Sequence, residues 1–280
     1  MYIDTHSPLS MQTSVCNYLN TTPVALRELF DYVSQEAQND SYFDAGKANS
    51  LFANYIQSNL PETSITDILF FHLSRRLNSA TEPIANNLYD LLSTQNETTR
   101  FFKAHDVEFV LEDDHFTIIH KGSPISLDNK YESGTPYLRW RLGYTDRIDY
   151  CVNGFMLKDL LYKNNYARDL YYAPELIEHL SAFLNRPDIR IDYMNNSTYY
   201  CFEYCVPLDM VLFDDSELLS SKEKEIYILT KVLNRLHDYH TTDPEYIFDH
   251  DNPILRLSDT DTMPASFCVN QEIITASMIR

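Results

Sequence analysis

A single carboxylate lies in the most aromatic stretch of this sequence. Residues 199–206 read YYCFEYCV and end before Pro207. The aromatic and β-prone composition predicts a strand. In a strand with alternating side chains, Glu203 shares a face with Tyr199, Cys201 and Cys205. Burial of an unpaired carboxylate is costly, so Glu203 must be solvated, paired or functional. The structural alternative is that its face meets solvent at a sheet edge, and the pattern leaves these alternatives open.

A histidine ends a second predicted strand. Residues 66–73 read TDILFFHL, a short apolar run between polar residues that is typical of a buried strand. A lone histidine in such a position is more often a core residue bonded to backbone than a ligand-binding group. The functional alternative for His72 is an imidazole that holds a ribose hydroxyl.

Two further groups could bind a planar ring and its phosphates. Asn153-Gly154 predicts a turn, residues 155–162 predict a helix after it, and Phe155 and Tyr162 could sandwich a ring. Arg139 and Arg141 flank the only tryptophan and could bind a pyrophosphate bidentately. Core packing of the aromatic residues and a solvated, charged strand face for the arginines are the structural alternatives.

Other nucleophile and metal patterns are weak. The odd number of 5 cysteines predicts reduced thiols, and Cys201 and Cys205 lie too far apart along a strand for a tight zinc hook. The polar setting of a histidine- and aspartate-rich segment indicates scattered surface residues, so no metal is expected; this segment contains His237, Asp238, Tyr239, His240, Asp249 and His250. No G-x-S-x-G elbow is found, and a cysteine hydrolase has no local motif in its favour.

Composition limits the partners. The formal net charge of −19 disfavours nucleic acid and anionic membranes and suits a basic protein partner. With 5 glycines and no glycine-rich phosphate loop, any nucleotide site must use side chains. Neither a Sec-type leader nor a membrane-spanning apolar run is visible, which predicts a cytoplasmic protein or delivery by a non-Sec secretion system.

The apolar periodicity predicts an α+β protein. Residues 1–61 form a helical region that begins a helix at Pro23 and ends another before Pro61. A hairpin is expected over 107–120, a helix from Pro174, and a short strand over 210–213. A helix follows Ser220, and the polar tail from about residue 240 has no clear order.

Three segments, in order, resemble the catalytic domain of bacterial type III secreted effectors that ADP-riboxanate arginine on host proteins. Residues 66–72 resemble the family's first core strand. Residues 154–161, continuing through 174–176, resemble the helical segment before its catalytic strand. Phe202-Glu203-Tyr204-Cys205-Val206-Pro207 resembles that strand, where the family has Glu-Tyr-His followed by an aliphatic residue and proline.

The resemblance covers about residues 62–215 and implies an ADP-ribosyltransferase-like split antiparallel core with NAD as co-substrate. It implies that Glu203 stabilises the cationic nicotinamide ribose, that Phe70 and His72 line the NAD site, and that Phe155 stacks near nicotinamide. Cys205 replaces the family's second catalytic residue, a histidine, which favours simple mono-ADP-ribosylation. No ankyrin repeats follow, so residues 1–61 or another element must recognise the target.

The sequence therefore predicts three regions: helices over 1–61, a catalytic domain over 62–216, and a helix with a polar tail over 217–280. The predicted function is transfer of ADP-ribose from NAD to a side chain, expected to be arginine, of a target protein. Catalysis is assigned to Glu203 and His72. The predicted NAD-binding residues are Phe70, His72, Asn153, Phe155, Tyr162, Arg139 and Arg141. The alternatives are a non-catalytic acidic protein, or inactive relative of the fold, that binds a basic partner, and a cysteine hydrolase.

Overall fold

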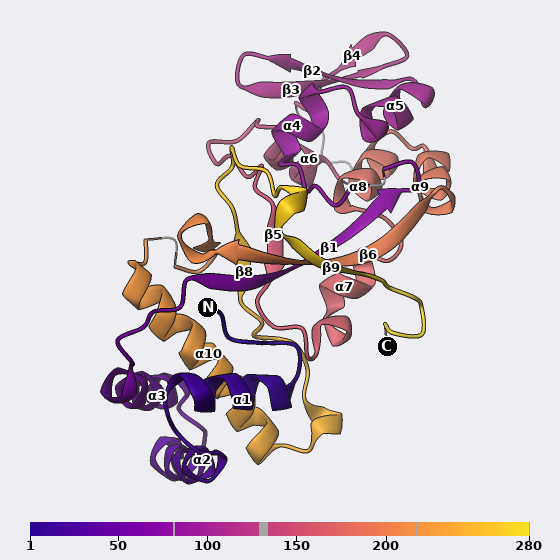
Figure 1. The fold of residues 1–280 in the computed structure, drawn as a ribbon. Coiled ribbons are helices and arrows are strands. Elements are labelled where there is room, and N and C mark those ends of the chain that lie inside the picture. The colour runs from indigo at the N-terminus through magenta and orange to yellow at the C-terminus, as the bar shows by residue number, and fades with distance from the viewer. Residues whose placement is uncertain (81, 129–133, 217, 280) are drawn as a thin grey trace. The chain divides into compact units, whose positions relative to one another are not determined.

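The computed structural model describes residues 1–80, 82–128, 134–216 and 218–279 (Figure 1). The chain is 43% helical and 21% strand with antiparallel sheets, which confirms the predicted α+β class. A six-stranded sheet has the order β7-β8-β5-β1-β6-β9, and a three-stranded sheet has the order β2-β3-β4.

Two compact units divide the chain, and each is built from three segments. The first unit comprises residues 1–71, 155–164 and 205–255, and the second comprises 72–154, 165–204 and 256–280. The long strands β1 (Asp67–Leu77) and β6 (Ser197–Pro207) each contribute residues to both units. This division differs from the three consecutive regions expected from sequence.

Four helices pack together in the first unit, and the signals that start them are local. They are α1 (Pro8–Tyr18), α2 (Pro23–Ala37), α3 (Ala45–Asn59) and α10 (Ser221–Thr241). The Thr22 hydroxyl caps α2 by accepting the Ala25 N–H, with Pro23 at the first helical position as predicted. Ser220 and Glu223 form a capping box at α10. The apolar stripes of α2 and α3 are buried, with Leu26, Phe30, Phe52 and Ile56 in the core.

The helix expected over residues 155–162 does not form. Asn153–Phe155 is strand β5, which pairs with β1 at Phe71 and Phe155, and only Leu161–Lys163 forms a short 3₁₀ helix, η1. The Met156 N–H donates a hydrogen bond to the Pro253 carbonyl oxygen, and the Leu157 N–H donates one to Asn252 Oδ1. These distant acceptors replace the i→i−4 bonds that a helix requires.

The C-terminal region is ordered, although its polar, proline-interrupted sequence gave no such signal. It contributes strands β8 (Ile254–Arg256) and β9 (Cys268–Ile273) to the six-stranded sheet. The strand expected over 210–213 is shorter, with β7 at Leu212–Phe213 after the 3₁₀ helix η2 (Leu208–Met210). Two other 3₁₀ helices are η3 (Pro244–Tyr246) and η4 (Ala265–Phe267).

The second unit contains the predicted hairpin, made of β2 (Val107–Glu112) and β3 (His115–His120), with β4 (Ser123–Ile125) beside β3. Its helices are α4 (Leu88–Ser93), α5 (Glu97–Ala104), α6 (Thr135–Arg141), α7 (Asn165–Asp169), α8 (Glu175–Phe183) and α9 (Pro187–Asn195). The helix α8 follows Pro174 as predicted. A hydrophobic core forms between these helices and the hairpin and includes Phe102, Val107, Phe116, Leu138 and Leu180.

Among the described residues, no helix combines the length and apolar character needed to cross a membrane.

Candidate functional site

Glu203 is buried inside the sheet. Its strand, β6, lies between β1 and β9, and the side chain is 6% exposed. Across the ladder it pairs with Asn270, whose Nδ2 lies 3.5 Å from Glu203 Oε2. Glu203 is therefore not on an edge strand, and the alternative of a solvent-facing edge carboxylate is wrong.

A second carboxylate lies on the same side of the sheet. Glu272 of β9 pairs with Cys201 of β6, and Cys201 and Glu203 point the same way because they are two residues apart. Glu272 is half-buried. We call this side of β6 and β9 the Glu203 face, with Ser197, Tyr199, Cys201, Glu203, Asn270 and Glu272 on it. Sequence reasoning missed Glu272, because only the register of β9 reveals its position.

Arg75 anchors one end of the Glu203 face. Its guanidinium donates to Ser197 Oγ at 2.8 Å and to the carbonyl oxygens of Tyr171 at 2.6 Å and Met194 at 2.9 Å. Tyr199 is buried nearby on the strand, and its hydroxyl donates to the Ala167 carbonyl of α7. These bonds fix the start of β6 and therefore the position of Glu203 along the strand.

His72 is held by backbone, as in the structural alternative. Its Nδ1 lies 2.7 Å from the Asn153 carbonyl oxygen, which joins β1 to β5. Burial, with a smaller effect of the Arg76 charge, lowers the pKa of His72 to about 4, so the imidazole is neutral at neutral pH. A neutral imidazole with Nδ1–H bonded to a carbonyl leaves Nε2 as an acceptor.

His72 and Glu203 point to opposite faces of the sheet. The Arg76 guanidinium carbon lies 4.0 Å from the centroid of the Phe202 ring, so Arg76 and Phe202 share a face. His72 is four residues from Arg76 in β1 and lies on that face, whereas Glu203 follows Phe202 in β6 and lies on the other. The structure does not bring together the two residues predicted to act in catalysis.

The other predicted NAD-binding residues, three aromatic residues and Asn153, are divided between the two units. Phe70 is fully buried in the core, and Phe155 is 7% exposed and paired with Phe71. Tyr162 is half-buried in η1. These three belong to the first unit. Asn153 is exposed and belongs to the second, where its Oδ1 accepts from the Cys151 thiol at 2.8 Å.

The two predicted phosphate-binding arginines lie on a helix, not on a strand. Arg139 and Arg141 are in the last turn of α6, where residues two apart point about 200° apart around the axis. Arg139 pairs with Asp128 at 3.0 Å, and Arg141 with the buried Asp149 at 2.9 Å. The expected joint clamp on one pyrophosphate is therefore not formed.

Arg141 also belongs to a buried cluster that sequence did not reveal. Asp149, Cys151 and Asp259 each place a possible ligand atom within 4.8 Å of the others. Asp149 is already paired with Arg141 and Asp259 with Arg256, and the Cys151 thiol donates to Asp149 Oδ1 at 3.1 Å. Two guanidinium groups already balance the two carboxylates, so the cluster is better suited to structure than to a cation.

Cys151 is expected to resist alkylation in the native protein. Burial, reinforced by Asp149, raises the pKa of Cys151 to about 12. At pH 8 such a thiol is ionised in roughly one molecule in ten thousand, and the thiolate is the reactive form. Iodoacetamide labelling at pH 8 with mass spectrometry should leave Cys151 unmodified until denaturant is added. Rapid labelling of the native protein at Cys151 would revive the cysteine hydrolase alternative.

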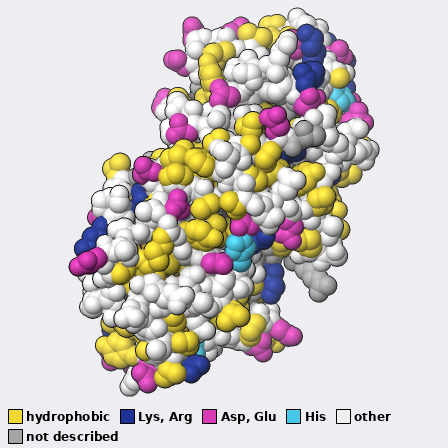
Figure 2. Space-filling view, viewed as in Figure 1, with side chains coloured by type: hydrophobic (Ala, Val, Ile, Leu, Met, Phe, Trp, Pro, Cys, Tyr) yellow, Lys and Arg dark blue, Asp and Glu magenta, His cyan; other side chains and the backbone are white. Residues whose placement is uncertain are grey.

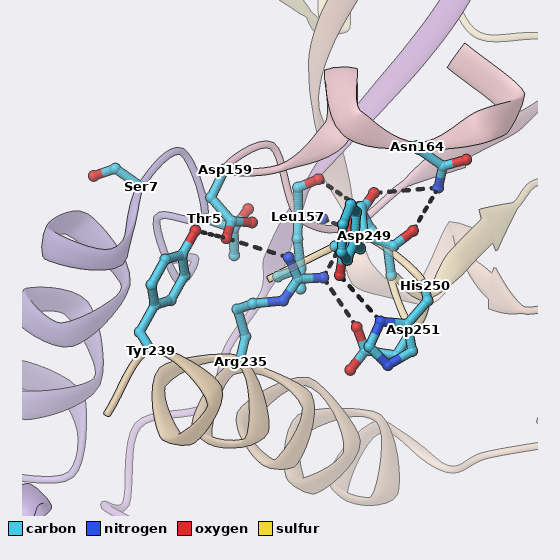
Figure 3. Close-up of polar contacts among 12 residues, drawn as sticks. Thr5, Ser7, Leu157, Asp159, Asn164, Arg235, Tyr239, Asp249, His250 and Asp251 are labelled. Carbon is cyan, nitrogen blue, oxygen red and sulfur yellow. Dashed lines mark hydrogen bonds and ion pairs between the residues drawn. The ribbon is translucent and has the colours of Figure 1, made fainter. Parts of the chain in front are cut away.

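The first unit contains a buried ion network around Arg235 (Figure 3). Arg235 is completely buried on α10, and its guanidinium contacts Asp159 at 3.3 Å, Asp249 at 2.6 Å and Asp251 at 3.1 Å. Tyr239 donates to Asp159 Oδ2 at 2.9 Å. The other oxygen of Asp249 accepts from the amides of Asn164 and Asn252. The network ties α10 to the 155–164 and 249–252 segments.

This network corrects the expectation that the histidines and aspartates of this segment are scattered on the surface. Asp249 is 5% exposed and His237 is 6% exposed. His237 Nε2 lies 2.8 Å from Ser34 Oγ, and His240 Nε2 lies 2.7 Å from Asp31 Oδ1. Asp249 and His237 therefore hold the first unit together.

Asp238, beside the network, is expected to make stability depend on pH. Burial, together with the Asp251 charge, raises the pKa of Asp238 from 3.8 to about 6. The native state then binds this proton more tightly than the unfolded state, so its contribution to stability is lost as pH rises through about 6. Asp238→Asn should raise the free energy of unfolding at pH 7.5 by about 1–3 kcal/mol and by less than half as much at pH 4.5, where the carboxyl is still protonated in the native state but already partly ionised in the unfolded state. Urea unfolding at both pH values tests this, with exposed Asp146→Asn as the control.

Two surface hollows occur among the described residues of the second unit. One, of about 230 Å³, is lined by residues of α8 and α9 such as Glu178 and Arg190. The other, of about 280 Å³, lies beside β3 and β4 and includes His115 and Tyr144. Both are smaller than a typical ligand pocket, and neither is lined by a predicted site residue.

Comparison of the chain with family models, with curated proteins and with solved structures gave no match. The chain's own residues are therefore the basis on which its function is proposed.

Proposed function

We propose that this chain is an NAD-dependent mono-ADP-ribosyltransferase that modifies an arginine of a target protein. The observation that carries the proposal is the pair of carboxylates on one sheet face, Glu203 buried at 6% exposure and Glu272 half-buried on the next strand. The segment around Glu203 is also the one that resembles the family's catalytic strand. An acidic target-binding protein with a net charge of −19 suits a cationic acceptor.

The chemistry requires stabilisation of a cation. The bond between nicotinamide and C1′ of the ribose breaks, nicotinamide leaves with the electron pair, and positive charge develops on the ribose. A fixed carboxylate in a poorly solvated position beside C1′ stabilises that developing ribose charge more than it stabilises bound NAD, in which the positive charge is on the nicotinamide ring. A guanidinium nitrogen of the acceptor then bonds to C1′ and loses a proton, for which the second carboxylate is the base.

The proposal assigns these two roles to residues of the Glu203 face. Glu203, which is held in register by the Asn270 pairing, stabilises the ribose cation. Glu272, which lies on the outermost strand, receives the acceptor arginine. Arg75 is a positioning residue, because its donors are bonded to Ser197, Tyr171 and Met194. His72 joins β1 to β5 on the other face and is not given a catalytic role.

The test is nicotinamide release from NAD by the purified protein, with and without a cell lysate as a source of targets. We expect release that rises when lysate is present, together with a labelled protein band when the adenine moiety of NAD carries a label. No release, combined with no effect of NAD on the melting temperature, would exclude the transferase.

The second candidate is a non-catalytic protein that binds a basic partner. The observation in its favour is the surface charge: acidic side chains are spread over the face drawn in Figure 2, and basic ones occur in few places. This candidate predicts partner binding without NAD turnover, unchanged by Glu203→Gln. The same release assay therefore separates the two functions.

A further inference from the structure

The six-stranded sheet ends in a six-residue strand, β9, with no further described strand beside it. The Ile274 N–H donates inward to the Tyr199 carbonyl at 2.9 Å. In an antiparallel ladder, inward-pointing and outward-pointing residues alternate. The register of Tyr200 with Ile273 and of Phe202 with Gln271 then places the N–H and C=O groups of Gln271 and Ile273 on the outer edge.

Little in β9 protects this edge from pairing. Natural edge strands often carry lysine or proline, and residues 268–273 contain neither. Val269 is 59% exposed and Ile273 is 56% exposed, so apolar side chains flank the free backbone groups. The irregularity between Glu203 and Tyr204 leaves Val269 out of the ladder, but the pairing of 270–273 with β6 remains regular.

Charge decides which kind of strand fits. The only charged residue of β9 is Glu272, the next strand carries Glu203, and the whole chain has a net charge of −19. A second copy fits poorly, because an antiparallel pairing of Gln271 with Ile273 of the other copy places two Glu272 side chains directly opposite each other, and like charges in that position are destabilising. A segment with arginine or lysine opposite Glu272 is favoured instead.

We propose that the outer edge of β9 binds an extended, basic segment of the target protein as an added strand. Backbone bonds to Gln271 and Ile273 give affinity, apolar residues of the segment contact Val269 and Ile273, and a cationic residue lies opposite Glu272. The proposal rests on the proposed function in one respect: the cationic residue is the arginine that receives ADP-ribose. Strand addition itself requires neither NAD nor turnover.

The test uses a fluorescent hexapeptide of alternating valine and arginine, with binding followed by anisotropy in the absence of NAD. Gln271→Pro removes one outward N–H and leaves the inward ladder to β6 intact, whereas Gln271→Ala keeps that N–H. We expect Gln271→Ala to bind the peptide as the native protein does and Gln271→Pro to bind at least tenfold more weakly. A form of the peptide that is N-methylated on alternate residues should bind the native protein at least tenfold more weakly than the unmodified peptide does.

Three results would overturn the proposal. Backbone pairing at this edge would be excluded if Gln271→Pro bound the valine–arginine peptide as tightly as the native protein does, and if the native protein bound the N-methylated peptide as tightly as the unmodified one. Equal binding of an alternating valine and glutamate peptide would exclude the charge argument. Concentration-dependent dimerisation that Gln271→Pro abolishes would assign the edge to a second copy. Nicotinamide release measured separately, without peptide, keeps a failure of NAD chemistry distinct from a failure of strand addition.

Discussion

Replacement of Arg235 by methionine is expected to lower the free energy of unfolding by about 3–5 kcal/mol, the usual cost of removing one partner from a buried ion network. The substitution keeps most of the side-chain volume but leaves Asp159 and Asp249, whose side chains are at most 1% exposed, without their cation. Urea denaturation at pH 7.5 measures the loss. The loss should shrink at pH 5, because the isolated carboxylates can then bind protons.

An exposed ion pair provides the matched control. Arg190 lies 3.4 Å from Glu178, and both side chains are more than 40% exposed, so Arg190→Met should change stability by less than about 0.5 kcal/mol. A triple variant that combines Arg235→Met with Asp159→Asn and Asp249→Asn should recover part of the loss, since no buried charge remains unpaired. A loss below 1 kcal/mol for Arg235→Met would show that the network contributes little.

Glu203→Gln is expected to reduce nicotinamide release by about 10²–10³-fold, the range typical for loss of a group that stabilises transition-state charge. The amide preserves shape and the contact with Asn270 but removes the negative charge. Glu272→Gln should reduce transfer to arginine more than it reduces release without an acceptor. Initial rates with and without the small acceptor agmatine measure both effects.

His72 and Glu203 lie on opposite faces of the sheet, so substitutions at the two residues are expected to affect nicotinamide release differently. Because His72 lies on the other face of the sheet, His72→Asn should reduce release less than tenfold, and the exposed Glu108→Gln should leave it unchanged. A large loss in His72→Asn, with correct folding shown by an unchanged melting curve, would place the reaction on the His72 face and contradict the assignment of the Glu203 face.

Local sequence signals predicted the elements whose stability is local. The start signal at Pro23 and the apolar periodicity identified α2, α3 and α10, and the two runs on either side of residues 112–115 identified the hairpin. The pattern failed at 155–162, where the backbone bonds to Thr5, Asn252 and Pro253 instead of forming a helix. Such bonds depend on residues about 95 to 150 positions away, and no local pattern records them.

The candidate site shows the same limit. The aromatic neighbours of Glu203 marked it as an unusual carboxylate in the sequence, and its 6% exposure excludes the solvent-facing edge position. Whether His72 and Glu203 share a face depends on the pairing of β1 with β6, and a shift of one residue reverses the answer. Glu272, Asp249 and Asp259 lie in the polar C-terminal region, so composition concealed that they belong to strands and buried networks.

The interleaving of the two units has a consequence for how the chain is made. Helices α2 and α3 emerge from the ribosome early, yet the helix that covers them, α10, begins at Ser221. At a translation rate of 5–20 residues per second, the segment from Phe71 to Cys205 takes roughly 7 to 30 seconds to appear. During that interval the apolar stripes around Phe30 and Phe52 lack their partner. The nascent chain should therefore depend on a holding chaperone, and fragments that stop before residue 205 should aggregate.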